Sequence, residues 1–366
     1  MDQAVQVELV ERLLAHVEHH STDLEEPSQR SVSAYIDPER FERERRLFTS
    51  GPMALGHASM LASPGDFLNL DGVRPLLLVR QDDGSVRGML NVCRHRGTPV
   101  EHEPRGHRAR FTCPYHGWSY RLDGTLAGIP HRRGFPGVQE DTHSLQPVAV
   151  EQTAGLLWAG GDPRMGALTD ELRGFGLHDG VLFGERARDY ALNWKLVFDI
   201  FLEAYHVRVA HARTIAPMFL DNVYLVDPYP PHLRNVFPKR TIVELAGRPR
   251  EHWRLREHAN VLYVLFPNTL VLIQPDHSAV LHVVPLAVDR TRLLSYAVIP
   301  EAPCGDKARG HWDANMRILY SAVDEDFALG EGIHRNLASG ANETLTFGAY
   351  EHALTRFHAQ VDAAIA

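Results

Sequence analysis

The stretch Cys93-Arg-His95, followed by seventeen residues and then Cys113-Pro-Tyr-His116, decides the fold of the region around it. Two cysteine–histidine pairs can hold a two-iron, two-sulfur cluster in which two thiolates bind one iron and two imidazoles bind the other. Because imidazole carries no negative charge, such a cluster is easier to reduce than one held by four cysteines. The sequence therefore predicts two loops of a β-rich domain that present these four side chains to one cluster.

The residues beside the two pairs favour tight turns between strands. Gly97 follows the first pair, and Pro114 and Gly117 flank His116. Such residues allow the backbone to turn sharply and to point N–H groups at cluster sulfurs. Strands are expected on both sides of the loops, over residues 76–80, 88–92 and 118–122.

A zinc site is the alternative for the same four residues, because Cys2His2 sets also bind zinc. Zinc motifs usually pair cysteine with cysteine and histidine with histidine, whereas each loop here supplies one of each. The mixed pairs therefore favour iron over a zinc-binding scaffold.

This region resembles the Rieske domain of the Rieske non-haem iron oxygenases. The matching stretches are Asn91-Val-Cys-Arg-His-Arg-Gly97 and Cys113-Pro-Tyr-His-Gly-Trp-Ser119. The resemblance implies a Rieske [2Fe–2S] cluster held by Cys93, His95, Cys113 and His116. A Rieske electron carrier would match equally well here, so the rest of the chain decides between the two.

Length and composition predict two domains in a reducing compartment. A chain of 366 residues is too long for one small cluster domain, and its net charge of −8 gives no basic surface for nucleic acid. No apolar run is long enough to span a membrane, and Met1-Asp-Gln-Ala-Val lacks the features of a signal peptide. Three cysteines cannot build a disulfide framework, which fits the cytoplasm.

The pattern along the chain predicts an α+β fold in three parts. These are an N-terminal helical segment over residues 1–48 that packs on the catalytic domain, a β-rich Rieske domain over 49–160, and a catalytic domain over 161–366 in which helices cover an antiparallel sheet. Helices are expected over 5–19, 39–47, 194–211 and 307–334, the last broken near Glu331-Gly332, and strands over 241–245, 261–266, 270–273, 279–284 and 291–298.

A second metal site is indicated on the helix expected over residues 194–211. It carries Glu203-Ala-Tyr-His206-Val-Arg-Val-Ala-His211, and Asp324-Glu-Asp326 comes far downstream. Two histidines and one carboxylate form the facial triad of mononuclear iron(II) oxygenases, with positions left open for O2. His206 and His211 are five residues apart, about 140° around an ideal helix, so they do not share a face. Either the helix is distorted there or His211 lies beyond its end.

The second half of the chain resembles the catalytic domain of the same oxygenase family. The matching residues are Asn193-Trp-Lys195, the Glu203-x-Tyr-His-x4-His211 segment and Leu265-Phe-Pro-Asn268. With the first region, the resemblance covers about residues 37 to 340. It implies a mononuclear Fe(II) held by His206, His211 and Asp326, with Asp324 as the alternative carboxylate.

Two acids on this helix are the predicted catalytic residues. The resemblance implies that Glu203, where the family usually has aspartate, accepts a hydrogen bond from His116 of a neighbouring subunit; an ordinary surface acid is the alternative. Asp199 lies seven residues before His206 and shares its helical face. We expect Asp199 either to orient a histidine or a water at the iron or to pair with Lys195.

The resemblance implies the terminal oxygenase (alpha) subunit of an oxidoreductase with several components. The chain has no dinucleotide-binding loop, so a separate reductase, with or without a ferredoxin, must supply electrons. O2 and a small organic substrate are the other partners, and a head-to-tail homotrimer fits the proposed link between subunits. Family reactions include monooxygenation by hydroxylation, oxidative demethylation, and the cis-dihydroxylation by dioxygenases that begins aromatic hydrocarbon catabolism.

Two further groups of residues are candidates for contacts with partners. Arginines near the cluster loops suit an acidic electron donor or a neighbouring subunit; these are Arg94, Arg96, Arg105, Arg108 and Arg110. The expected pocket residues are Phe198, Leu202, Val207, Met218, Phe219, Tyr263, Leu270 and Ile273, with Gln274, His277 and His282 as candidates for a polar substrate group.

Overall fold

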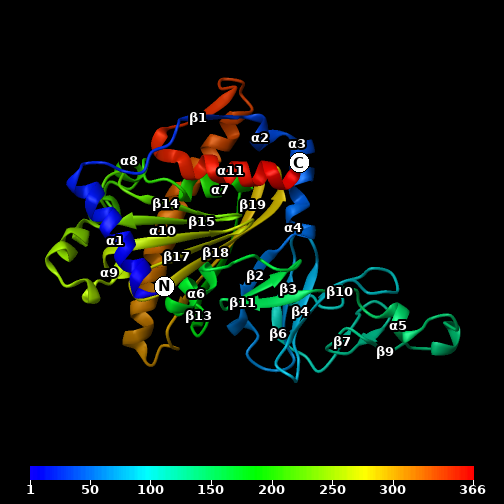
Figure 1. Cartoon of the computed structure of the whole chain (residues 1–366). Helices are drawn as coiled ribbons and strands as arrows, with labels where there is room; N and C mark the ends of the chain where they lie inside the picture. The colour runs from blue at the N-terminus through cyan, green and yellow to red at the C-terminus, as the bar shows by residue number, and fades with distance from the viewer. The chain divides into compact units, whose positions relative to one another are not determined.

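Strand pairing divides the chain into two units in the computed structural model, which describes residues 1–366 (Figure 1). One unit is Phe48–Pro163, and the other combines Met1–Leu47 with Arg164–Ala366. The first unit is built mainly from strands, and the second sets helices against one large sheet. The expected α+β class, with a β-rich domain and an antiparallel sheet covered by helices, is confirmed.

The smaller unit presents both cysteine–histidine loops from short antiparallel sheets. The second loop is the tip of a hairpin between β7 (Phe111–Thr112) and β8 (Ser119–Tyr120), and the first follows β5 (Val86–Leu90). The other elements of this unit are β2 (Met53–His57), η1 (Ala58–Met60), β3 (Asp66–Leu70), β4 (Leu76–Arg80), β6 (Arg105–His107), β9 (Leu126–Gly128), η2 (Arg132–Gly134), α5 (Glu140–His143), β10 (Pro147–Val148), β11 (Val150–Thr153) and β12 (Leu156–Ala159).

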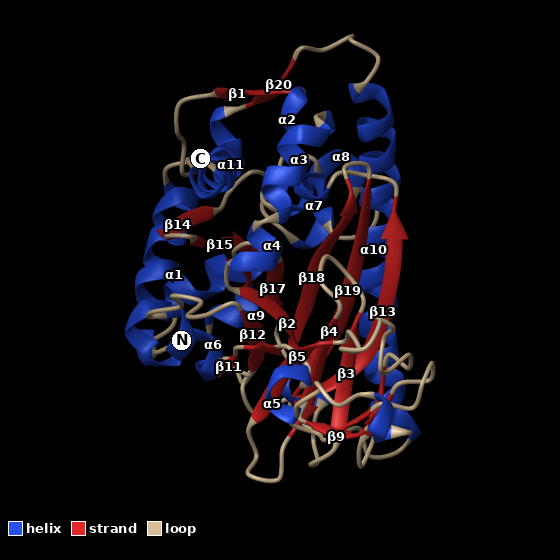
Figure 2. Cartoon of the chain, turned by 90° about the vertical axis from the view of Figure 1, so that its right-hand side faces the viewer, coloured by secondary structure: helices blue, strands red, loops and turns tan.

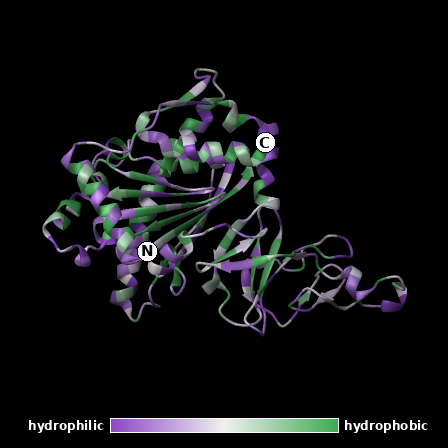
Figure 3. Ribbon diagram, in the orientation of Figure 1, coloured by the Kyte–Doolittle hydropathy of each residue, from purple (hydrophilic) through white to green (hydrophobic).

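A seven-stranded antiparallel sheet, in the order β13-β19-β18-β17-β16-β15-β14, organises the larger unit (Figure 2). Its strands are mostly apolar, as the green of the sheet in Figure 3 shows. The inner strands are buried on both faces, which explains their continuous apolar runs in the sequence. The strands are β13 (Val181–Tyr190), β14 (Leu225–Tyr229), β15 (His232–Pro238), β16 (Ala259–Leu265), β17 (Thr269–Ile273), β18 (Ser278–Ala287) and β19 (Arg290–Ile299).

Helices from both ends of the chain pack around this sheet. The long helix α10 (Asp306–Leu337) contacts β13 and α7 (Trp194–Phe201), and α11 (His352–Ile365) contacts α7 and β15. None of the helices has the length together with the apolar composition that a membrane crossing requires. The remaining elements are α1 (Gln3–Glu18), β1 (Ser28–Ser31), α2 (Ser33–Ile36), α3 (Pro38–Arg45), α4 (Leu47–Ser50), α6 (Leu168–Gly174), α8 (Val207–Ala210), η3 (Ala216–Met218), η4 (Arg240–Gly247), η5 (Arg250–His252), α9 (Leu255–His258), β20 (Thr344–Phe347) and η6 (Ala349–Glu351).

Two sequence-based expectations about this unit are wrong. Residues 241–245, expected as a strand, lie in the 3₁₀ helix η4, where the buried Ile242 and Leu245 are three residues apart, as three residues per turn require. The break expected in α10 near Glu331 is absent. Gly330 and Gly332 each cost only about 1 kcal/mol in the helix interior, and burial of apolar residues such as Val323 and Phe327 outweighs this cost.

A buried ion pair joins the N-terminal segment to α7. Glu44, on the highly charged helix α3, is fully buried and binds the buried ammonium of Lys195. Its carboxylate also accepts hydrogen bonds from Trp194 at 2.9 Å and Arg40 at 2.8 Å. Burial lowers the pKa of Lys195 to about 8, although Glu44 acts to raise it. The pair therefore fixes the start of the helix that leads to His206.

We expect Glu44→Gln to lower the free energy of unfolding by about 3–5 kcal/mol, because it leaves the Lys195 charge buried without a counter-ion. The folded pKa of Lys195 lies below the usual value of about 10.4, so the charged form is disfavoured by folding. The charge-dependent part of the loss should therefore shrink as the pH rises towards about 8 and be absent above it, because Lys195 is then neutral in both folded proteins. Urea unfolding at pH 7 and pH 9 measures both effects. The exposed Glu42→Gln on the same helix is the control; equal losses in the two variants would contradict the prediction.

Candidate metal centres

The two cysteine–histidine loops share one backbone design. In the first loop the N–H of Cys93 donates to the carbonyl of Thr98 at 2.9 Å, and the N–H of Gly97 donates back to the carbonyl of Cys93 at 2.9 Å. In the second, Cys113 and Gly117 repeat this pattern with distances of 2.8 and 3.0 Å. Both glycines have positive φ, +83° and +74°, a conformation that side chains disfavour. The repeated turn presents two thiols and two imidazoles in matching positions.

The four predicted cluster ligands converge. Both cysteines are buried free thiols, and their Sγ atoms lie within hydrogen-bonding reach of each other. The Nδ1 atoms of His95 and His116 lie 3.1 Å apart on the more exposed side. The His95 ring stacks on Trp118 with centroids 4.9 Å apart and an interplanar angle of 6°. Two sulfurs on one side and two imidazole nitrogens on the other match the donor set of a mixed-ligand [2Fe–2S] cluster.

Hydrogen-bond donors surround the two sulfurs. The N–H groups of Tyr115 and His116 point at the sulfur of Cys113, and the Tyr120 hydroxyl lies 3.4 Å from the sulfur of Cys93. Burial and the hydrogen bond to Cys93 raise the pKa of Tyr120, so its hydroxyl stays protonated and can donate. Donors to cluster sulfur stabilise the reduced state, which carries more negative charge.

We expect Tyr120→Phe to lower the reduction potential of a bound cluster by about 40 mV, because a net hydrogen bond is worth about 1 kcal/mol. Protein-film voltammetry or a redox titration followed by EPR measures the shift. Tyr115→Phe removes a hydroxyl from an exposed tyrosine of the same loop and should leave the potential unchanged. Wild-type potential in Tyr120→Phe would show that the hydroxyl does not act on the cluster.

The arginines near the loops do not form one group. Arg108 binds the buried Glu101 at 2.9 Å and lies over the Phe67 ring, so its role in holding this unit together is explained without a partner. Arg94, Arg96, Arg105 and Arg110 are exposed.

The helix expected over residues 194–211 is interrupted, and the interruption builds the second centre. Asn193 caps α7 by accepting the N–H of Lys195, and α7 ends at Phe201. A turn follows, and the short helix α8 begins directly after His206 and ends directly before His211. The five-residue spacing predicted either a distorted helix or a His211 beyond the helix end. Both are present, because the helix is broken before His206 and His211 follows the last residue of α8.

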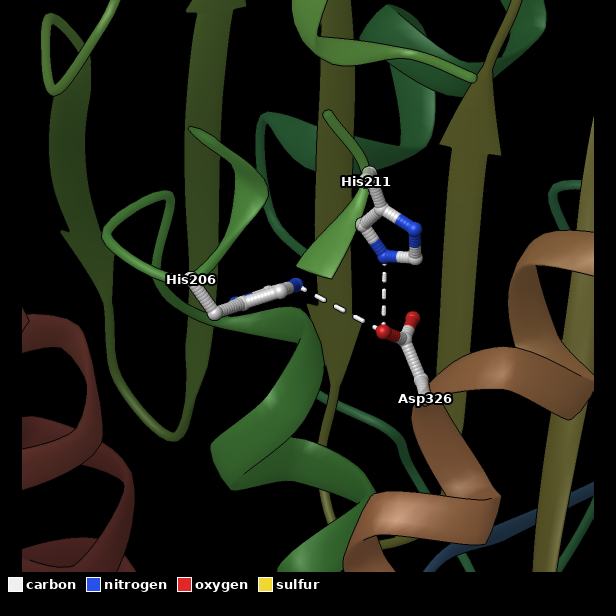
Figure 4. Close-up of side chains that lie close together, drawn as sticks. All are labelled: His206, His211 and Asp326. Carbon is white, nitrogen blue, oxygen red and sulfur yellow. Dashed lines mark ion pairs between the residues drawn. The ribbon is translucent and has the colours of Figure 1, made fainter. Parts of the chain in front are cut away.

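His206, His211 and Asp326 come together in the larger unit, with their potential ligand atoms all within 4.8 Å of one another (Figure 4). Asp326 Oδ1 lies 2.7 Å from His211 Nε2 and 3.7 Å from His206 Nε2. The hydrogen bond to Asp326 is the largest effect that raises the pKa of His211. The donor set suits a divalent ion of the non-haem iron type.

A second carboxylate holds each histidine from behind. Glu203 binds Nδ1 of His206 through one oxygen and accepts the backbone N–H of His206 through the other at 3.1 Å. Glu325 lies 3.2 Å from Nδ1 of His211. Carboxylates at Nδ1 fix the tautomer that leaves Nε2 free for a metal. The sequence analysis did not predict the contact of Glu325 with His211. The position of Glu325 directly before Asp326 on the same helix could have indicated it.

Asp324 and Asp326 face different surroundings. Asp324 accepts hydrogen bonds from Tyr190 at 2.9 Å and Arg186 at 2.6 Å and pairs with Arg188. Two residues along a helix correspond to about 200° of rotation. Asp326 therefore points towards the two histidines, and Asp324 points away from them.

Asp199 contacts neither Lys195 nor the two histidines of the second centre. The Tyr35 hydroxyl donates to Asp199 at 2.6 Å, and His358 Nε2 lies 2.8 Å from its other oxygen. Lys195 is engaged by Glu44, and His206 and His211 are held by Glu203 and Glu325. Asp199 instead ties α7 to α2 and α11, two elements whose positions in the sequence gave no sign of this contact.

A cavity of about 660 Å³ opens beside the three clustered residues. Strand alternation decides which predicted residues reach it: Leu262 and Leu272 line the cavity, so their neighbours Tyr263 and Ile273 face the other side of the sheet. His282 is held by Thr269 and Tyr296 instead. Of the expected residues, the cavity is lined by Val207, Met218, Phe219, Gln274 and His277, and not by Phe198, Leu202, Tyr263, Leu270, Ile273 or His282.

Both regions match known families. Residues 177–366 match the ring hydroxylating alpha subunit (catalytic domain), and residues 52–145 match the Rieske [2Fe-2S] domain. The solved structure of a quaternary ammonium Rieske monooxygenase has the same fold, with a TM-score of 0.80 and 21% identity over 94% of this chain and 96% of that chain.

Two characterised proteins are similar in sequence. The chain is 32% identical over 206 residues to the carnitine monooxygenase oxygenase subunit of Escherichia coli (strain K12), across 53% of this chain and 54% of that protein. It is 33% identical over 215 residues to the chlorobenzene dioxygenase subunit alpha of Cupriavidus sp. (strain PS12), across 54% and 47%. The chain thus spans about half the length of the curated relatives it matches.

Proposed function

The chain belongs to the ring hydroxylating alpha subunits, since just over half of it matches the catalytic domain of that family, and from this premise we propose that it is the terminal oxygenase component of a Rieske-type system. In this proposal it uses O2 and electrons from a separate reductase, with or without a ferredoxin, to hydroxylate or oxidatively demethylate a small organic substrate. The single observation that carries the proposal is the presence of both ligand sets in one chain.

The proposed roles follow the two donor sets. A bound [2Fe–2S] cluster supplies single electrons, and a bound ferrous ion with open positions supplies O2 activation. In the cluster domain, residues 49–160, the four cysteine and histidine side chains hold the cluster. In the catalytic domain, residues 161–366 with the helical segment 1–48, His206, His211 and Asp326 hold the ion. Glu203 and Glu325 keep both histidines in the binding tautomer.

We also propose that the working form is a homotrimer in which His116 of one subunit meets Glu203 of the next. His116 and Tyr115 are exposed, which leaves the cluster loop free for such a contact. Beside Glu203, the side chains of Tyr205 and Val209 are 61% and 80% exposed, which is unusual for apolar groups in a monomer. Light scattering should give a mass of three chains; a stable monomer with full activity would contradict the link.

The relatives favour two reaction types. Similarity to carnitine monooxygenase favours monooxygenation, by hydroxylation or oxidative demethylation. The alternative is cis-dihydroxylation in aromatic hydrocarbon catabolism, which the similarity to chlorobenzene dioxygenase favours. Anaerobic reduction followed by O2, a substrate panel and product identification separates the two. The exposed Arg94, Arg96 and Arg110 suit an acidic electron donor.

We expect metal analysis to find about three irons and two acid-labile sulfides per chain, because one set of donors suits a two-iron cluster and the other a single iron. The loaded protein should be brown and should contain no stoichiometric zinc. Plasma emission spectroscopy with a sulfide assay measures all three elements. One tightly held zinc without labile sulfide would remove the oxygenase proposal and leave a zinc-binding scaffold.

A further inference from the structure

Polar residues form a row on the sheet face that lines the cavity. Asn260 on β16 pairs across the strands with Phe237 on β15. The register of β16 with β17 places Gln274 opposite Asn260, directly after the last residue of β17. Leu262 and Leu272, two residues along each strand, face the same side. All five residues line the cavity, so its floor changes from apolar to polar along the strands.

Asn260 has an unsatisfied hydrogen-bonding group in this row. Its Oδ1 is buried and has no hydrogen-bond partner. A buried unpaired amide costs free energy, so native proteins seldom keep one without a ligand or water to satisfy it. Since amide oxygen and nitrogen positions are interchangeable by rotation, Asn260 can offer either an acceptor or an NH2 donor to a ligand.

Lys239 lies two residues beyond Phe237 and lines the same cavity. Its ammonium forms one hydrogen bond, to the Glu257 carbonyl at 3.3 Å, and no ion pair, which leaves two N–H donors. Burial lowers the pKa of Lys239, as expected for a cation that lacks a close counter-ion. Arg240 adds a second positive charge to the lining.

The carboxylates that line the cavity are already engaged. Glu203 and Asp326 hold the two clustered histidines. Asp221 pairs with Arg208 at 3.2 Å. None of these lining carboxylates pairs with Lys239, on which Asp276 and Glu257 act only from beyond ion-pair distance.

The strand sets a distance between the two ends of the site. On β15, Asn235 donates to the carbonyl of Leu202, at the helix interruption that precedes His206. Lys239 lies four residues beyond Asn235. Because a strand rises about 3.3 Å per residue, the Cα atoms of Asn235 and Lys239 are about 13 Å apart. A ligand that fills the cavity can thus reach from the cation towards the clustered histidines.

We propose that the substrate is a small organic acid whose carboxylate binds Lys239 and the amide of Asn260, with its reacting end towards His206, His211 and Asp326. This inference rests on the proposed function, because it takes the cavity as the substrate site. The ammonium and the amide NH2 are both hydrogen-bond donors, and a carboxylate accepts from both.

The test is a binding measurement that needs no turnover. Isothermal titration calorimetry under anaerobic conditions compares γ-butyrobetaine and 4-phenylbutanoate with their methyl esters, on cluster-loaded protein with and without added Fe(II). Each acid should bind about 10- to 100-fold more tightly than its ester, because hydrogen bonds to a charged group are stronger than neutral ones. Lys239→Met should abolish this preference, and Lys307→Met, at an exposed lysine, should preserve it.

Asn260→Asp separates ligand contact from folding. It keeps the shape but adds a negative charge, so acid binding should weaken by at least about tenfold while ester binding stays the same. An unchanged acid-to-ester ratio in Lys239→Met, or no preference in the wild type, overturns the inference. Acid preference without O2 consumption by the reduced, iron-loaded protein would instead contradict the proposed function and leave the acid site standing.

Discussion

Asp326→Ala should lose the mononuclear iron and all turnover while keeping the brown cluster. Asp326 is the carboxylate that touches both histidines, at 2.7 and 3.7 Å from their Nε2 atoms. Two neutral imidazoles without an anionic ligand hold a ferrous ion poorly. Iron content should fall from about three to about two per chain, since the cluster of two irons remains. Metal analysis and EPR of the reduced cluster measure the two centres separately.

Asp324→Ala is the matched control for this change. Asp324 lies two residues away on the same helix but binds Arg186, Arg188 and Tyr190. It should keep the mononuclear iron and activity, with a loss of stability below about 1 kcal/mol for these partly exposed pairs. Iron retained in Asp326→Ala and lost in Asp324→Ala would exchange the two assignments.

Glu203→Gln should leave both metal centres assembled and the cluster reducible by its partner, yet slow reoxidation of the cluster in the presence of substrate and O2 by orders of magnitude. The amide keeps an acceptor for Nδ1 of His206 but removes the charge that, in the proposed trimer, binds His116 of the neighbouring subunit. Stopped-flow absorbance of the reduced cluster measures the rate. Glu203→Asp retains the charge and should retain part of the transfer.

Glu325→Gln distinguishes a link between subunits from a role in positioning. Glu325 holds His211 as Glu203 holds His206, through Nδ1. Glutamine keeps the acceptor for Nδ1 but loses the negative charge, so any weakening of iron binding should be similar in the two variants, and saturating Fe(II) should overcome it. If saturating Fe(II) restores fast reoxidation in both variants, Glu203 acts only through His206 and the link is contradicted.

The local sequence was informative wherever short-range geometry decides the outcome. The cluster loops need a cysteine, a histidine and a glycine within a few residues, and their backbone hydrogen bonds run within each loop. The apolar runs at residues 261–266 and 270–273 predicted strands, because strands buried on both faces leave no polar alternation. The strand expected at 241–245 was wrong because Ile242 and Leu245 are buried three residues apart, which is the spacing of a 3₁₀ helix and not the alternation of a strand.

Contacts between distant segments needed the tertiary structure. Nothing local distinguishes Asp324 from Asp326 except the direction in which α10 faces, and packing of that helix on α7 and β13 sets this direction. The seven-residue spacing predicted that Asp199 shares a helical face with His206, but α7 ends at Phe201, and Tyr35 and His358, more than 150 positions away in the sequence, bind the Asp199 carboxylate. The Oδ1 of Asn260, which lacks a hydrogen-bond partner, and the ammonium of Lys239, which lacks an ion pair, likewise come to one cavity only through the register of the sheet.

The sequence by itself therefore determined the family, the fold class and the residue types of both donor sets, because spacing within a loop or a helix constrains chemistry directly. Only the tertiary structure decided which acid meets the histidines, which carboxylates hold them, and which sheet residues face the cavity. The physical reason is that helix rotation and strand register follow from packing over the whole domain. A one-residue shift in strand register would turn a different set of side chains towards the cavity. A rotation of α10 about its axis would replace the ligand Asp326 by a surface acid. Neither change would alter a sequence motif.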